Sequence, residues 1–109
     1  VYSGDDSLTL PIMSVGGAGV ISVAAHVVGR RLKTMVDDYV QGRISEAAKT
    51  HQELLPLFKV LFITANPIMV KAALQLLGFE VGSLRLPLVE ATSEQLEELK
   101  SVLQDLGLI

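Results

Sequence analysis

Residues 15–29 read VGGAGVISVAAHVVG, with three glycines immediately before a short apolar run. A loop that binds the phosphates of a dinucleotide has a strand before its glycines and a helix after them. Here the order is reversed, because the preceding residues have helical spacing, and the Gly-Lys-Ser/Thr ending of a phosphate loop is missing. The glycines therefore predict the end of a helix and a tight turn that leads into a buried strand over residues 20–24.

The residues before this turn predict a second strand and a short helix. Residues 1–3 are β-prone and stop at Gly4. A helix is expected to begin near Leu8, because Pro11 is tolerated only in a first turn, and to end before Gly16. A strand that is apolar on both faces is typical of a parallel sheet. Because the chain starts within a predicted strand, we expect it to be a piece of a longer protein.

Beyond residue 29 the apolar residues follow a helical period, recurring at i, i+3, i+4 and i+7. Cap and turn signals divide this region into four helices and an extended linker, RLPL, at residues 85–88. The first two predicted helices run from Arg30 to Gly42 and from Ser45 to Phe62, the second with a kink at Pro56. The third has its N-cap at Asn66 and Pro67 in its first position, and it ends at Gly78. The fourth begins with a capping box of Thr92 with Gln95 and runs to residue 106.

Composition excludes several classes of protein. Half of the 109 residues are hydrophobic and 19% are charged, which argues against disorder. The net charge of −3, with basic residues scattered singly, predicts no nucleic-acid partner and no membrane surface partner. The chain has no cysteine and no apolar run of the roughly 20 residues that span a bilayer.

The loops that follow the two predicted strands are the local site candidates, because carboxyl ends of parallel strands form sites in α/β proteins. Asp5 and Asp6 are adjacent, so their carboxylates rarely converge, and we interpret them as cap and turn residues. His26 follows the second strand and is either a structural residue or part of a site. His51 lies on a helical stripe and is interpreted as packing. None of the five lysines lies on an apolar strand, so no local nucleophile stands out.

Three segments together resemble the C-terminal part of the dihydrodipicolinate synthase family. They are YSGDDSLTLPIMSVGGAGVISVAAHV at residues 2–27, NPIMVKAALQLLG at residues 66–78 and LRLPL at residues 84–88. The resemblance covers the whole chain in order and implies an α/β fold, the last two strands of a (β/α)8 TIM barrel followed by a C-terminal helical extension. Residues 1–29 would be the end of the barrel, and residues 30–109 the closing barrel helix and the extension.

The resemblance also implies an activity. Members of the family condense pyruvate, held as a Schiff base on a lysine, with aspartate semialdehyde in lysine biosynthesis. That lysine lies upstream, so no catalytic residue, metal or cofactor is expected in this chain. Ile21 matches a position whose backbone carbonyl lies near the pyruvate-derived group, and Gly4 and Asp5 match the rim where the second substrate is placed. The segment 8–15 resembles a contact between dimers of a homotetramer, in the cytoplasm or in a plant plastid.

Two alternatives stay open. N-acetylneuraminate lyases and keto-sugar-acid aldolases share the barrel and the Schiff base, although the NPI-x-VK motif at residues 66–71 favours the synthase. A non-catalytic helical interaction module belongs to a different class. The predicted strand over residues 20–24 argues against such a module, because an apolar strand without polar alternation needs neighbours on both sides.

Overall fold

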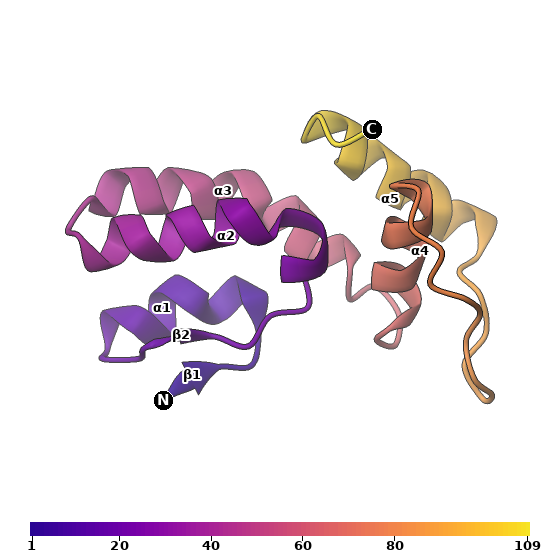
Figure 1. Ribbon diagram of the computed structural model, residues 1–109, viewed down its shortest axis with the longest axis horizontal. Coiled ribbons are helices and arrows are strands. Elements are labelled where there is room, and N and C mark those ends of the chain that lie inside the picture. The colour runs from indigo at the N-terminus through magenta and orange to yellow at the C-terminus, as the bar shows by residue number, and fades with distance from the viewer. The chain divides into compact units, whose positions relative to one another are not determined.

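The computed structural model describes residues 1–109, which form two compact units, residues 1–55 and residues 56–109. Along the chain the elements are β1 (Tyr2–Ser3), the 3₁₀ helix η1 (Asp6–Leu8), α1 (Thr9–Ser14), β2 (Gly19–Val20), α2 (Ala25–Val40), α3 (Ile44–Val60), α4 (Ile68–Leu76) and α5 (Ser93–Asp105) (Figure 1). No helix among them is both long and apolar enough to cross a lipid bilayer.

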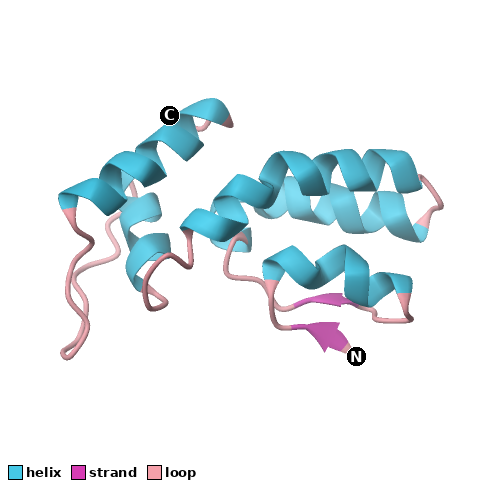
Figure 2. Ribbon diagram, turned by 180° about the vertical axis from the view of Figure 1, so that it is seen from behind, coloured by secondary structure: helices cyan, strands magenta, loops and turns pink.

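The first unit begins with a β–α–β arrangement. The strands β1 and β2 are parallel, and their register pairs Tyr2 with Gly19 and Ser3 with Val20. Parallel strands need a crossover connection, which η1 and α1 supply here. Figure 2 shows the two magenta strands side by side beneath α1. The buried Met13 of α1 contributes to the core of this unit.

The turn between α1 and β2 confirms the prediction from the glycines. The N–H groups of Val15 and Gly17 both donate to the Ile12 carbonyl, at 3.2 and 2.9 Å. Gly16 has a φ of +103°, a backbone conformation that glycine adopts without steric cost. The stretch is therefore a helix end and a turn into a strand.

The predicted strand over residues 20–24 is wrong beyond Val20. The Asp6 carboxylate accepts hydrogen bonds from the Ser22 hydroxyl and from the Ala24 N–H, the latter at 3.0 Å. The Ser22 hydroxyl in turn accepts from the Ala25 N–H at 2.8 Å. These bonds take the chain out of the sheet and into a helix, although its apolar, partly β-branched sequence is typical of a strand.

Helix α2 starts at Ala25, five residues before the predicted Arg30. Val28, with φ −128° and ψ 35°, separates the first turn from the regular helix that follows. The helix ends as predicted, because Gly42 follows it with a φ of +82°. At this end the buried Asp38 accepts from the Arg43 guanidinium, with Nη2 and Oδ1 2.6 Å apart.

Helix α3 is close to its predicted range of residues 45–62 and contains Pro56; the kink there stays a prediction. The sequence spacing predicts that one side of this helix is apolar, with Ala47, His51, Leu54, Leu55, Phe58, Leu61 and Phe62. This prediction is only partly confirmed, since Phe62 is 44% exposed while Leu57 and Val60, which lie outside the predicted set, are buried. The buried residues that the prediction and the structure share are Ala47, Leu54, Phe58 and Leu61.

In the second unit the predicted N-cap of α4 is wrong. The N-cap is Pro67 rather than Asn66, and it makes no side-chain cap bond. The Ile68 N–H instead donates to the Ala65 carbonyl at 3.0 Å, so the first turn does not use the Asn66 side chain. Gly78, with a φ of +93°, follows the end of the helix as predicted. The buried residues of α4 are Ile68, Met69, Val70, Ala72 and Ala73.

The segment between α4 and α5 is not simply extended. Leu86 and Pro87 form a turn that the Leu88 N–H closes by donating to the Arg85 carbonyl at 3.0 Å. Two side chains of α4 attach this segment, because Lys71 Nζ donates to the Ser83 carbonyl at 2.6 Å and Gln75 Nε2 to the Gly82 carbonyl at 3.1 Å.

Helix α5 packs against α4 and begins with the predicted capping box. The Thr92 N–H donates to Gln95 Oε1 at 2.9 Å, and the Gln95 N–H donates to Thr92 Oγ1 at 3.2 Å. The sequence spacing predicts an apolar stripe of Leu96, Leu99, Leu103 and Leu106 on this helix, and of these Leu99 and Leu103 are fully buried.

Candidate functional site

The loops after β1 and β2 lie next to each other. Because the strands are parallel and in register, their carboxyl ends meet at the same edge of the sheet. The last rung joins them, since the Ile21 N–H donates to the Ser3 carbonyl at 2.9 Å. Gly4, Asp5 and Ile21 are the three site residues that the family resemblance predicts. The structure brings Ile21 beside the chain that leads into Gly4 and Asp5.

After this rung the Asp5 N–H does not continue the ladder. With Ser3 paired to Val20, the next rung of a parallel ladder would join the Asp5 N–H to the Ile21 carbonyl. The buried Ser3 hydroxyl instead accepts from the Asp5 N–H at 3.1 Å and donates to the Asp5 carbonyl at 2.6 Å. The Ile21 carbonyl therefore keeps its capacity to accept a hydrogen bond from a ligand.

Asp5 acts as the cap that the sequence predicted. Its Oδ1 accepts from the Ser7 N–H at 2.8 Å and from the Ser7 hydroxyl at 2.6 Å, at the start of η1. Both bonds use the same carboxylate oxygen, which leaves Oδ2 for other partners. Gly4 lies beside it, and a Cβ built there would meet no atom within 4 Å. This rim is open and carries one exposed carboxylate.

Asp6 has a role that the sequence analysis missed. Its side chain is almost fully buried, with 2% exposure, and connects the two loops through Ser22 and Ala24. The available signal was Ser22, because a serine hydroxyl readily accepts from the backbone N–H three residues on, here that of Ala25, where a chain turns into a helix. A helix start there would have ended the strand early and left Ser22 close to the carboxylates after β1.

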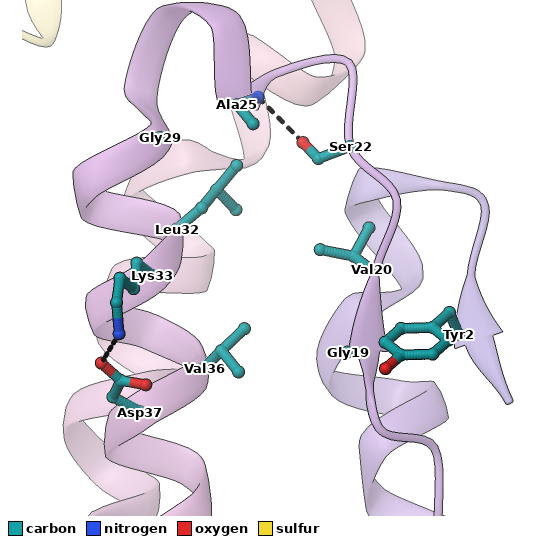
Figure 3. Close-up of a pocket in the computed structure, with 10 residues that line it drawn as sticks. All are labelled: Tyr2, Gly19, Val20, Ser22, Ala25, Gly29, Leu32, Lys33, Val36 and Asp37. Atoms are coloured by element: carbon teal, nitrogen blue, oxygen red, sulfur yellow. Dashed lines mark hydrogen bonds and ion pairs between the residues drawn. The ribbon is translucent and has the colours of Figure 1, made fainter.

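A cavity of about 400 Å³ lies between β2 and α2 (Figure 3). Lys33 and Asp37 form an ion pair of 2.7 Å on its α2 side. The residues that line it are Tyr2, Gly19, Val20, Ser22, Ala25, Gly29, Leu32, Lys33, Val36 and Asp37. Gly4, Asp5 and Ile21 do not line this cavity.

The histidines and lysines add no nucleophile to this edge of the sheet. His26 is exposed in the first turn of α2, and any role in a site stays a prediction. His51 of α3 lines a second cavity, of about 320 Å³, together with Leu10 and Tyr39. All five lysines lie on helices and none is buried; they are Lys33, Lys49, Lys59, Lys71 and Lys100.

A model of the dihydrodipicolinate synthetase family matches residues 1–106. The 4-hydroxy-tetrahydrodipicolinate synthase of Heliobacterium modesticaldum is 58% identical over 108 residues, which are 99% of this chain and 36% of that protein. The synthase of Thermosynechococcus vestitus is 55% identical over 109 residues, which are 100% of this chain and 37% of that protein. The chain therefore spans little more than a third of the length of these curated relatives.

Solved structures of such synthases superpose on this chain over nearly its whole length. The synthase from Cyanidioschyzon merolae, solved with lysine bound, superposes with a TM-score of 0.97 at 46% identity, over 99% of this chain and 37% of that one. The synthase from Acinetobacter baumannii, solved in complex with pyruvate, superposes with a TM-score of 0.92 at 33% identity, over 100% of this chain and 38% of that one. The fold described above is thus that of a part of these enzymes.

Proposed function

The chain belongs to the dihydrodipicolinate synthetase family, and we propose that it is the C-terminal part of a 4-hydroxy-tetrahydrodipicolinate synthase. The complete enzyme would hold pyruvate as a Schiff base on a lysine and condense it with aspartate semialdehyde in lysine biosynthesis. The observation that carries this proposal is the family match over residues 1–106, which includes both strands and the loops that follow them.

Within the complete enzyme, residues 1–29 are the end of a (β/α)8 barrel, with its last two strands, the helix between them and the first turn of α2. Residues 30–109 are the rest of this closing barrel helix and a C-terminal helical extension. The parallel arrangement of β1 and β2 supports this assignment, because every strand of such a barrel is parallel to its neighbours and is followed by a helix. Each strand pairs here on one edge, and its other edge would pair with a further barrel strand.

The Ile21 carbonyl suits the covalent intermediate better than it suits free pyruvate. A carbonyl oxygen only accepts hydrogen bonds, and ionised pyruvate has no donor. When a lysine amine adds to the ketone carbon, the adduct gains a hydroxyl, and loss of water then leaves a nitrogen-bound Schiff base. The Ile21 carbonyl would accept a hydrogen bond from this adduct. Its position at the carboxyl end of β2 supports the role.

Gly4 and Asp5 form the rim for the second substrate in this proposal. Aspartate semialdehyde carries an ammonium group, and the exposed Asp5 carboxylate has one oxygen that Ser7 does not use. Gly4 leaves room beside it. An ion pair between Asp5 and the ammonium group would then help to distinguish this aldehyde from uncharged sugar aldehydes.

The complete enzyme is proposed to be a homotetramer in the cytoplasm, or in the plastid if the source is a plant. The segment 8–15 would contact a second dimer. Two apolar side chains at its ends support this, since Leu8 is 47% and Val15 85% exposed. Schiff-base chemistry on a lysine needs no metal or cofactor.

Borohydride reduction of the complete enzyme with pyruvate tests the proposal. We expect one pyruvate adduct per subunit, on a lysine outside residues 1–109, and turnover when aspartate semialdehyde is added. Turnover with sugar aldehydes instead would assign the chain to the sister aldolases. If neither an adduct nor turnover were found, the proposed function would be wrong.

A further inference from the structure

We propose that Asp6 is a positioning residue for this reaction, holding the chain directly after Ile21 so that the Ile21 carbonyl keeps one direction. The inference rests on the proposed function, because it assigns that carbonyl to the pyruvate-derived group. Asp6 would not touch the substrate; it would act through Ser22 and Ala24.

The two bonds to Asp6 fix its carboxylate in one orientation. Oδ1 accepts from the Ser22 hydroxyl, and Oδ2 accepts from the Ala24 N–H at 3.0 Å. Burying a carboxylate is costly unless hydrogen bonds compensate for the lost water, and Asp6 is only 2% exposed. Both acceptor oxygens are therefore committed to the loop after β2, and the loop cannot move without leaving the carboxylate unpaired.

The Ile21 carbonyl lies between two anchors. On its N-terminal side, the Ile21 N–H donates to the Ser3 carbonyl at 2.9 Å. On its C-terminal side, the peptide bond joins it to Ser22, whose hydroxyl donates to Asp6. The same hydroxyl accepts from the Ala25 N–H at 2.8 Å (Figure 3). Because a peptide unit is planar, fixing Ser22 limits the rotation of the Ile21 carbonyl.

This arrangement has a kinetic consequence. A hydrogen-bond acceptor stabilises an intermediate most when its direction is set before the reaction, and a displacement of about 1 Å can cost a large factor in rate. Loss of the Asp6 bonds should therefore slow the step that forms the covalent pyruvate adduct. The rate of the step that uses the second substrate should change little.

The test compares four variants of the complete enzyme. In Asp6→Asn an NH2 group replaces one of the two carboxylate oxygens, and because it only donates it cannot accept from the Ser22 hydroxyl or the Ala24 N–H, so one of the two bonds is lost as it stands. Ser22→Ala removes the hydroxyl, and Ser22→Thr keeps it. Asp37→Asn is the matched control, because it makes the same chemical change at a carboxylate that pairs only with the exposed Lys33.

We expect Asp6→Asn and Ser22→Ala to lower kcat/KM for pyruvate by about tenfold, with KM for aspartate semialdehyde changed by less than about twofold. Ser22→Thr should recover most of the lost activity, and Asp37→Asn should behave like the unmodified enzyme. A saturating pyruvate concentration should still give the borohydride adduct in every variant.

A purely structural role would give a different pattern. If Asp6→Asn melts at a lower temperature but keeps the kcat/KM for pyruvate of the unmodified enzyme, the positioning role is refuted while the proposed function stands. If Asp6→Asn does not fold, the comparison of Ser22→Ala with Ser22→Thr tests the positioning role in its place. Equal kcat/KM values for pyruvate in that pair refute the proposal. Absence of an adduct in the unmodified enzyme refutes the proposed function itself.

Discussion

A Cβ atom at Gly17 would lie 2.8 Å from the carbonyl oxygen of Ile12. The same carbonyl accepts hydrogen bonds from Val15 and Gly17, so it is held in place by the turn that it closes. The glycine at position 17 is therefore required by space rather than by its φ angle.

Gly17→Ala should destabilise the complete enzyme by about 1–3 kcal/mol, the usual cost of inserting a methyl group where backbone must move. Ala18→Ser is the matched control, because it also adds one heavy atom, at an exposed neighbouring position, and should change stability by less than about 0.5 kcal/mol. Urea denaturation measures both values. Equal stability of the two variants would contradict the close contact with Ile12.

Thr92→Ala should lower the free energy of unfolding by about 1 kcal/mol, because it removes the side chain that accepts from the Gln95 N–H. Thr92→Ser keeps that acceptor, and because serine is at least as good an N-cap as threonine it should leave the free energy of unfolding nearly unchanged. If Thr92→Ala and Thr92→Ser have the same urea midpoint, the capping box does not stabilise α5 in solution.

Arg43→Ala should cost about 1–2 kcal/mol of stability, because it leaves the carboxylate of Asp38 without its partner at a side-chain exposure of only 12%. Lys33→Ala breaks an ion pair of similar length whose lysine is 76% exposed, and it should cost less than about 0.5 kcal/mol. Urea denaturation at low and high salt measures the loss of stability in both variants, and salt should reduce the loss more for the exposed pair of Lys33. A larger loss for Lys33→Ala would contradict the burial of Asp38.

The parts of the fold that could be predicted from the sequence are those that depend on neighbouring residues. A glycine turn needs space and a positive φ within a few residues, and a capping box needs two side chains three residues apart. Both were predicted, at Gly16 and at Thr92, and both are confirmed. The end of α2 at Gly42 is a third case of this kind.

The parts that could not be predicted depend on residues far apart in the chain. The early end of β2 follows from bonds between Asp6 and a loop 16–18 residues away, which an apolar run of residues does not reveal. The assignment of Ile21 came from the family resemblance and not from its side chain, which is 72% exposed. A backbone carbonyl leaves no mark in composition or periodicity, so only a family pattern or a structure can point to it.

Ile21→Val should leave turnover of the complete enzyme within about twofold of the unmodified value, because the proposed role belongs to the backbone and not to the side chain. Inserting one alanine between Gly19 and Val20 should abolish turnover, since a shift of one residue in register breaks the rung from the Ile21 N–H to the Ser3 carbonyl and moves the Ile21 carbonyl from its place. Equal effects of the two changes on pyruvate turnover would exclude the backbone role.

The last prediction concerns residues 1–109 expressed alone. A Schiff base on an enzyme forms at an amine that the protein holds against the carbonyl of its substrate. Each of the five lysines lies on a helix, none is buried, and Lys71 is already attached to the Ser83 carbonyl at 2.6 Å. The isolated chain should therefore give no more borohydride-trapped pyruvate adduct than the same chain unfolded in urea, which is the matched control.

Co-expression with the remaining part of the enzyme should give a stoichiometric adduct on that other part, as read by intact mass. A stoichiometric adduct on residues 1–109 would make one of these lysines the nucleophile and would overturn the assignment of the Schiff base to another part of the enzyme.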